Sequence, residues 1–175
     1  MGRNLDDEQL LALKATGGVI QVVAYDGFVK TTNPDSPERA AARRQFDLPT
    51  SSGPGQRGRF QGALKALPLE KRAEYETKLA EIDRQFPADP PVAVTDFVDH
   101  IDYAVNLIGI DHVGISSDFD GGGGVEGWND ASESFNVTLE LVRRGYTEEQ
   151  IAKLWSGNLL RVMRAVERIA TELKR

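Results

Sequence analysis

Residues 109–121 read Gly109-Ile-Asp-His-Val-Gly-Ile-Ser-Ser-Asp-Phe-Asp-Gly121, an apolar run that leads into two carboxylates and a run of glycines. Val113 and Ile115 give the run the β-branched character of a buried strand. Asp118 and Asp120 follow where that strand should end, and the carboxyl ends of parallel strands are where α/β proteins place their chemistry. The residues alone leave two interpretations open: a catalytic edge, or a tight turn with two solvated aspartates.

Composition limits the classes of protein to consider. The chain has 175 residues, of which 40% are hydrophobic, so one domain with a sizeable core is expected. Its net charge of −6 disfavours a nucleic-acid partner, because such proteins carry a clustered basic face. Without cysteine it has no disulfide framework or thiolate zinc site. No apolar run approaches the ~20 residues that span a bilayer, and residues 1–8 lack a signal-peptide core, which leaves the compartment open.

The first part of the chain predicts a helix over residues 6–16 and then a strand over residues 19–24. The strand is almost continuously apolar, which is typical of a parallel sheet covered on both faces. Residues 30–92 predict a helical and loop insertion. In it, helices over 37–46 and 68–86 flank a mobile loop whose low-complexity tip is Ser51–Gly58.

Residues 93–175 predict the last helix–strand–helix units. Thr95 is expected to cap a helix before the strand over 112–117, and a further helix begins near Asn136. Thr147 and Gln150 have capping-box spacing. After a break at residues 157–158, a final helix carries an apolar stripe that is expected to be core: Leu159, Val162, Met163, Val166, Ile169 and Leu173.

These elements indicate an α/β protein, yet they include two convincing strands. Two parallel strands cannot close a sheet and leave open edges. Either further strands exist or the chain is part of a larger barrel.

Several segments, in this order along the chain, resemble the membrane (renal) dipeptidase family of zinc metallopeptidases. They are residues 3–7, 18–23, 99–104, 109–121, 141–151 and 157–162. The resemblance covers residues 1–175, with 30–92 as the insertion. It implies a single partial domain, the C-terminal part of a (β/α)8 TIM-like barrel.

The resemblance also implies dipeptide hydrolysis with two zinc ions at the carboxyl end of the strands. Asp118 matches the aspartate that passes a proton to the leaving amine, and Arg3 matches the arginine that grips the substrate carboxylate. Tyr25 matches an aromatic residue of the pocket. The chemistry is consistent, since zinc-bound water ionises near neutral pH and a guanidinium pairs with a carboxylate through two parallel hydrogen bonds.

One departure limits what this chain is expected to do alone. The family's metal ligands (a His-x-Asp pair, a bridging glutamate and two further histidines) all lie upstream of the segment that this chain resembles. His100 and His112 are both expected to be structural, so no metal ligand is predicted here.

Three hypotheses therefore stand. The chain is part of a complete dipeptidase and is itself inactive, it is an association module that needs a homo-oligomer or a missing N-terminal half, or it is an amino-acid binder.

Overall fold

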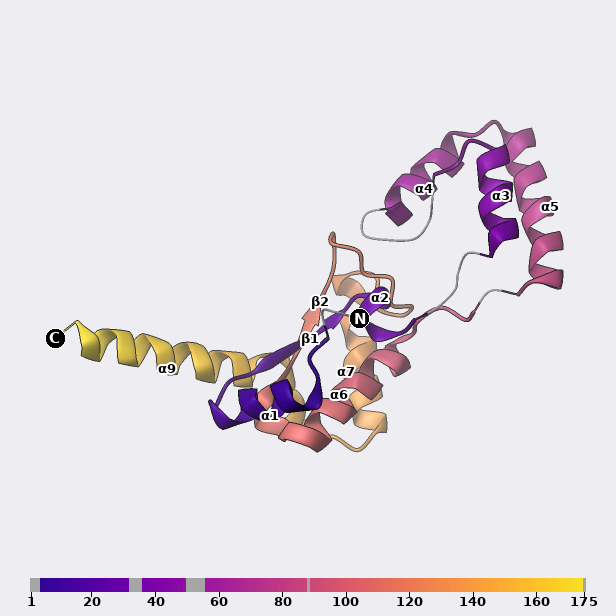
Figure 1. The fold of residues 1–175 in the computed structure, drawn as a ribbon. Helices are drawn as coiled ribbons and strands as arrows, with labels where there is room; N and C mark the ends of the chain where they lie inside the picture. The colour runs from indigo at the N-terminus through magenta and orange to yellow at the C-terminus, as the bar shows by residue number, and fades with distance from the viewer. Residues whose placement is uncertain (1–3, 32–35, 50–55, 88, 175) are drawn as a thin grey trace.

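A computed structural model describes residues 4–31, 36–49, 56–87 and 89–174 of the chain. Figure 1 shows a small sheet-and-helix unit, from which a helical insertion and the C-terminal helix extend. The main elements are α1 (Asp7–Ala15), β1 (Ile20–Ala24), α2 (Asp26–Val29), α3 (Pro37–Gln45), α4 (Gln56–Ala66), α5 (Leu69–Gln85), α6 (Val94–Ile108), β2 (Val113–Ser117), α7 (Ser134–Arg143), α8 (Glu148–Ala152) and α9 (Asn158–Leu173).

The sheet of the described residues is a parallel pair, β1 and β2. The register runs from Ile20 opposite Val113 to Ala24 opposite Ser117, so both strands end at the same edge. The prediction of an α/β chain with two parallel strands is confirmed. A closed barrel goes beyond what these strands establish.

Helix α6 supplies most of the core under the sheet. Its apolar positions recur at helical spacing, and Phe97, Val98, Ile101 and Ile108 are fully buried. Trp128 extends this core through ring contacts with Phe97, Phe119 and Trp155. The helix begins at Val94, so the prediction that Thr95 caps it is wrong: Asp96 accepts the Ala93 N–H instead, at 2.9 Å.

The insertion between β1 and α6 has a small core of its own, formed by Ala42, Phe46, Leu48 and Tyr75. Helices α3 and α5 were predicted from their sequence patterns. Helix α4 was not, and it occupies much of the stretch where a mobile loop was predicted. The helix forms because Phe60, Ala63 and Leu64 pack against that core. The loop tip at residues 50–55 lies outside the described residues.

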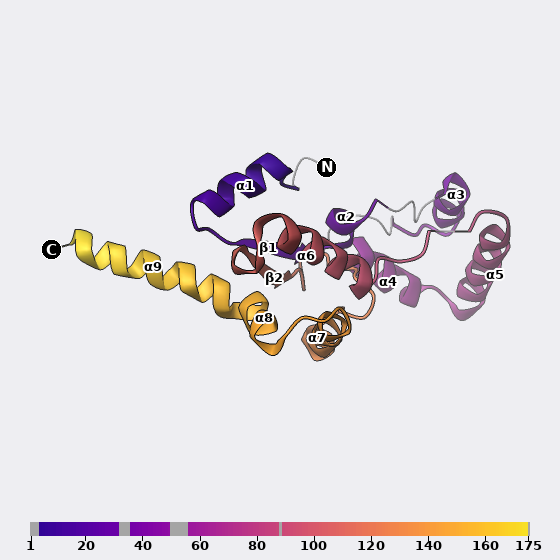
Figure 2. The same ribbon diagram turned by 90° about the horizontal axis from the view of Figure 1, so that it is seen from below.

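The C-terminal elements also depart from expectation. A π-helical turn, Lys153–Gly157, joins α8 to α9, so the predicted break at Gly157–Asn158 is a continuous helix. Helix α9 then leads away from the sheet (Figures 1 and 2). The prediction that its apolar stripe is core is wrong in this structure, because no described element covers its outer part. Five of its six predicted members are 41–83% exposed: Leu159, Met163, Val166, Ile169 and Leu173.

Candidate functional site

The candidate site lies where the two strands end. Tyr25 follows the last residue of β1 and Asp118 follows the last residue of β2. Because Ala24 lies opposite Ser117 in the parallel register, the sheet brings Tyr25 and Asp118 to the same edge. The sequence patterns had placed both residues at strand ends, and the structure brings them together.

A glycine loop, Gly121–Gly124, packs against both side chains. A Cβ added to Gly122 would lie 2.6 Å from the Tyr25 ring and 3.1 Å from Oδ2 of Asp118. A Cβ on Gly121 would lie 2.6 Å from Oδ1 of the same carboxylate. The loop therefore lets the backbone approach the two side chains more closely than any other residue type would permit.

Hydrogen bonds fix the loop to both strand ends. The Gly123 N–H donates to Oδ2 of Asp118 at 3.3 Å, and the Gly123 carbonyl accepts the Asp26 N–H at 2.8 Å. Gly124 has a φ of +87°, and a Cβ there would clash with the Asp26 carboxylate. The backbone of one residue, Gly123, thus links the end of β1 to the end of β2 through its N–H and its carbonyl.

Sequence reasoning did not single out Asp26. Its carboxylate packs on Gly124 and its Oδ1 accepts the Gly27 N–H at 2.6 Å. The signal that could have found it is positional: Asp26 follows Tyr25 at the end of β1, as Asp118 follows β2, so the register places a second carboxylate at this edge.

Tyr25 is a neutral hydrogen-bonding group in this setting. Burial raises the pKa of its phenol, and the nearby carboxylates of Asp26 and Asp118 raise it further. Its ring also packs edge-on against Phe28, with 4.8 Å between centroids. Tyr25 therefore keeps its proton at physiological pH and is available as a donor beside Asp118.

The other predicted residues lie elsewhere. Arg3 falls outside the described residues, so its position relative to Asp118 is not part of the geometry above. Asp120, two residues beyond Asp118, is exposed and has a φ of +63°. It belongs to the turn, in line with the solvated-aspartate interpretation for that one residue.

Both histidines hydrogen-bond to backbone carbonyls. His112 Nδ1–H donates to Gly18 O at 2.8 Å, where the chain is about to enter β1, and so ties the amino ends of the two strands. His100 Nε2–H donates to Val29 O at 2.6 Å. The hydrogen bond of His112, at the strand end opposite Asp118, is consistent with the structural role that was expected of it. Within the described ranges, no three His, Cys, Asp or Glu side chains gather as a metal ion requires.

A parallel strand pair with a carboxylate and a glycine loop at its carboxyl ends is an α/β arrangement in which functional groups gather at that edge of the sheet. The family model of the membrane dipeptidases, Peptidase family M19, matches residues 1–175, and the chain belongs to that family.

The relatives are consistent with this assignment. "Dipeptidase ataJ" of Aspergillus terreus is 50% identical over 74 residues, which are 42% of this chain and 18% of the relative. "Dipeptidase tcpJ" of Claviceps purpurea is 41% identical over 88 residues, 49% of this chain and 21% of the relative. This chain thus spans about a fifth of the length of these curated relatives.

Solved structures share the fold. The probable dipeptidase PvdM from Pseudomonas aeruginosa superposes with a TM-score of 0.58 and 42% identity, over 91% of this chain and 40% of PvdM. A metallo peptidase from Rhodobacter sphaeroides, liganded with a phosphinate mimic of L-Ala-D-Ala, has a TM-score of 0.54. The match covers 90% of this chain and 30% of the metallo peptidase chain, at 19% identity. At that identity the likeness concerns the fold alone. In the described part of the chain, none of the helices combines the length and apolarity needed to cross a bilayer.

Proposed function

We propose that this chain forms the substrate-binding and proton-transferring part of a zinc-dependent dipeptidase. The observation that carries the proposal is the arrangement of Tyr25 and Asp118 around the glycine loop, at the carboxyl ends of paired parallel strands. The dipeptidase relatives and the likeness to PvdM support the same reaction class.

Asp118 is the proposed proton carrier. Oδ2 accepts the Gly123 N–H, which holds the carboxylate in one orientation without neutralising it. A carboxylate held in this way is suited to take a proton from the attacking water and to deliver it to the leaving amine. Peptide hydrolysis then yields two amino acids, one of which carries the protonated amine.

Tyr25 and Arg3 are the proposed substrate contacts. The phenol of Tyr25 stays protonated and can donate a hydrogen bond beside Asp118. The guanidinium of Arg3 would pair with the free carboxylate of the dipeptide, a contact that selects short substrates with a nearby C-terminus.

Zinc does not fit the described residues by themselves. Each histidine donates to a backbone carbonyl, and the two lie at separate places, His112 at the amino ends of the strands and His100 in α6. In this proposal the residues that hold the metal belong to the rest of the dipeptidase fold. In PvdM, that rest is the 60% of the chain that has no counterpart here.

The test is a chimera in which this chain replaces the matched segment of PvdM. We expect zinc-dependent hydrolysis of dipeptides and a loss of about 10²–10⁴-fold in kcat for Asp118→Asn, as for removal of a general acid–base group. Asp120→Asn is the matched control, since Asp120 is exposed and asparagine tolerates its positive φ.

Two results would contradict the proposal. One is an Asp118→Asn chimera that keeps more than half of its parent's kcat. The other is this chain, alone and supplied with zinc, hydrolysing dipeptides within tenfold of a full-length relative, because the described residues would then need no further ligands.

A further inference from the structure

The helical insertion leaves and rejoins the sheet unit at the edge where the candidate site lies. The outgoing chain passes from β1 into α2, where the Asp26 N–H donates to the Gly123 carbonyl at 2.8 Å. On the return, the Val92 carbonyl accepts the Glu126 N–H at 2.7 Å, and the Val94 N–H donates to the Glu126 carbonyl at 3.1 Å. Both connections are thus bonded to the glycine loop or to the residues just after it. Segments that follow parallel strands at this edge are the ones that build sites in α/β proteins.

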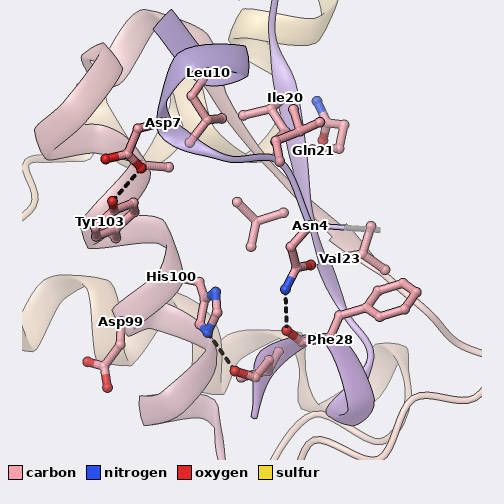
Figure 3. A pocket seen from close by; sticks show the side chains of 14 residues that line it. Asn4, Asp7, Leu10, Ile20, Gln21, Val23, Phe28, Asp99, His100 and Tyr103 are labelled. Atoms are coloured by element: carbon pink, nitrogen blue, oxygen red, sulfur yellow. Dashed lines mark hydrogen bonds between the residues drawn. The ribbon is translucent and has the colours of Figure 1, made fainter. Parts of the chain in front are cut away.

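The base of the outgoing connection is fixed to the sheet unit (Figure 3). Asn4 Nδ2 donates to the Phe28 carbonyl at 3.0 Å, and His100 Nε2 donates to the Val29 carbonyl at 2.6 Å. Lys30, the next residue, pairs with a carboxylate of α6 at 3.0 Å. A change in the orientation of the insertion would therefore begin beyond Lys30 and leave the strand ends in place.

The insertion packs as one body. Arg39 of α3 donates to Oδ1 of Asp83 of α5 at 2.5 Å, and the rings of Phe46 and Tyr75 lie 5.4 Å apart in its core. Among the described residues, this core and the core of the sheet unit have no member in common. A body with its own core and two connections can turn as a unit, in the manner of a hinged domain.

Helix α4 is the part of the insertion that lies toward the sheet unit. In both views of the ribbon it lies between α5 and the sheet unit (Figures 1 and 2). Its apolar residues Phe60, Ala63 and Leu64 pack on the core of the insertion. Arg59 and Lys65 lie outside that contact and are exposed, so the remaining sides of α4 are basic.

The charges of the two bodies are complementary. Cations outnumber carboxylates in residues 30–92, whereas carboxylates outnumber cations in the rest of the chain. Helix α4 contains no carboxylate, and the strand ends carry those of Asp26 and Asp118. Such charges attract each other across a distance set by the ionic strength, which is about 8 Å under physiological conditions.

We propose that the insertion is a cap that closes over the candidate site, with Arg59 and Lys65 of α4 turned toward the carboxylates of the strand ends. Closure would hold a short substrate at the edge and exclude water from it. The purpose of the cap rests on the proposed function, because a cap matters only where a substrate binds. Its movement requires only the hinge and the two charged surfaces, so the movement is measurable without catalysis.

The first experiment measures closure in this chain alone. The chain has no cysteine, so Ala80→Cys on α5 and Asn106→Cys on α6 place two spin labels at exposed positions outside the proposed contact. Lowering the salt from about 1 M to about 10 mM lengthens electrostatic screening from about 3 Å to about 30 Å, so the mean distance between the labels should shorten by about 5 Å or more.

Charge reversal identifies the surface that closes. Arg59→Glu should remove most of the shortening, and Lys65→Glu repeats the test if the first variant folds poorly. Arg84→Glu is the matched control, because Arg84 is exposed on the side of α5 opposite the buried Tyr75 and should leave the shortening unchanged.

The second experiment measures the effect on substrate in the PvdM chimera. Arg59→Glu should raise the KM for a dipeptide at least tenfold and leave kcat within about threefold, because Asp118 keeps its position on β2. Arg84→Glu should change neither constant.

The outcomes separate this inference from the proposed function. A label distance that does not respond to salt, or that responds equally in Arg59→Glu and Arg84→Glu, would overturn the cap. An active chimera with the same KM in both variants would overturn it as well. Salt-dependent closure that Arg59→Glu abolishes, in a protein whose chimera hydrolyses no dipeptide, would uphold the cap and count against the proposed function alone.

Discussion

Tyr25 and Asp118 approach the same glycine from neighbouring strands, and Gly122 lies between the tyrosine ring and the carboxylate. The approach is close enough that the absence of a side chain at Gly122 is a structural requirement. The stability of a protein with a side chain at Gly122 therefore tests whether the strand ends and the loop pack as one unit.

Gly122→Ala should destabilise the sheet unit by about 1–3 kcal/mol, the usual cost of overpacking, since its Cβ would lie 2.6 Å from the Tyr25 ring. Urea unfolding followed by tryptophan fluorescence measures this, because Trp128 and Trp155 belong to the same core. Gly62→Ala is the control: a Cβ there meets nothing within 4 Å, and alanine in a helix should stabilise α4 by about 0.5–1 kcal/mol. A Gly122→Ala protein as stable as its parent would contradict the close packing.

Arg144 is the next test, because it joins α7 to α6 through three carboxylates. It donates to Asp99 and Asp102 at 2.6 Å each and to Glu140 at 2.9 Å. Burial lowers the pKa of this guanidinium, but the three hydrogen bonds outweigh it and the pKa is raised overall.

Arg144→Met should cost about 1–3 kcal/mol, since it removes the guanidinium from the partly buried carboxylates of Asp102 and Glu140. The neighbouring Arg143→Met should change the free energy of unfolding by less than about 0.5 kcal/mol, because surface pairs contribute little. Their side chains are 21% and 67% exposed. Chemical denaturation of both variants measures the difference, and equal losses would show that the network adds nothing.

Asn158 gives a third prediction, at the amino end of the sheet. It is 2% exposed, and its Nδ2 donates to the carbonyls of Ile110 and Val113 at 2.6 and 2.8 Å. Asn158→Ala should destabilise the protein by about 1–3 kcal/mol, because it leaves carbonyls without donors at the start of β2. Thermal unfolding of the variants measures this loss. The control is Asn106→Ala, at an exposed position of α6, which should leave the melting temperature unchanged or slightly raised. Comparable melting temperatures for the two variants would show that the two hydrogen bonds of Asn158 do not stabilise the protein.

The parts that sequence patterns predicted correctly depend on local signals. Apolar runs locate β1 and β2 to within one residue, and the parallel arrangement follows from those runs. The ends of the strands then place Tyr25 and Asp118 at one edge. These features follow from neighbouring residues and the periods of strands and helices.

The parts that escaped prediction depend on contacts between distant segments. Asp26 matters through its packing on Gly124, which no spacing reveals. Helix α4 contains two glycines and forms because it packs on the core of the insertion. The stripe on α9 shows that a helical period identifies an apolar face but does not say what covers it.

Asp96 supports a last prediction, on acid stability. The hydrogen bond from the Ala93 N–H lowers the pKa of its carboxyl below the ordinary 3.8, and a hydrogen bond from Lys30 at 3.0 Å lowers it further. Because the folded state then binds this proton more weakly than the unfolded state, the contribution to stability is present above the ordinary pKa. It is lost as the pH falls through the lowered value.

Asp96→Asn should therefore reduce the free energy of unfolding by about 0.5–1.5 kcal/mol at neutral pH, and the gap to the parent should close as the pH falls below the ordinary pKa of 3.8 and through the lowered one. Lys30→Met separates the two causes: since the backbone hydrogen bond is the larger one, most of the acid dependence should survive. Urea titrations of the three proteins, from neutral pH to well below the ordinary pKa of 3.8, provide the measurement. A gap that stays constant with pH would show that the Asp96 carboxylate acts through its shape and not its charge.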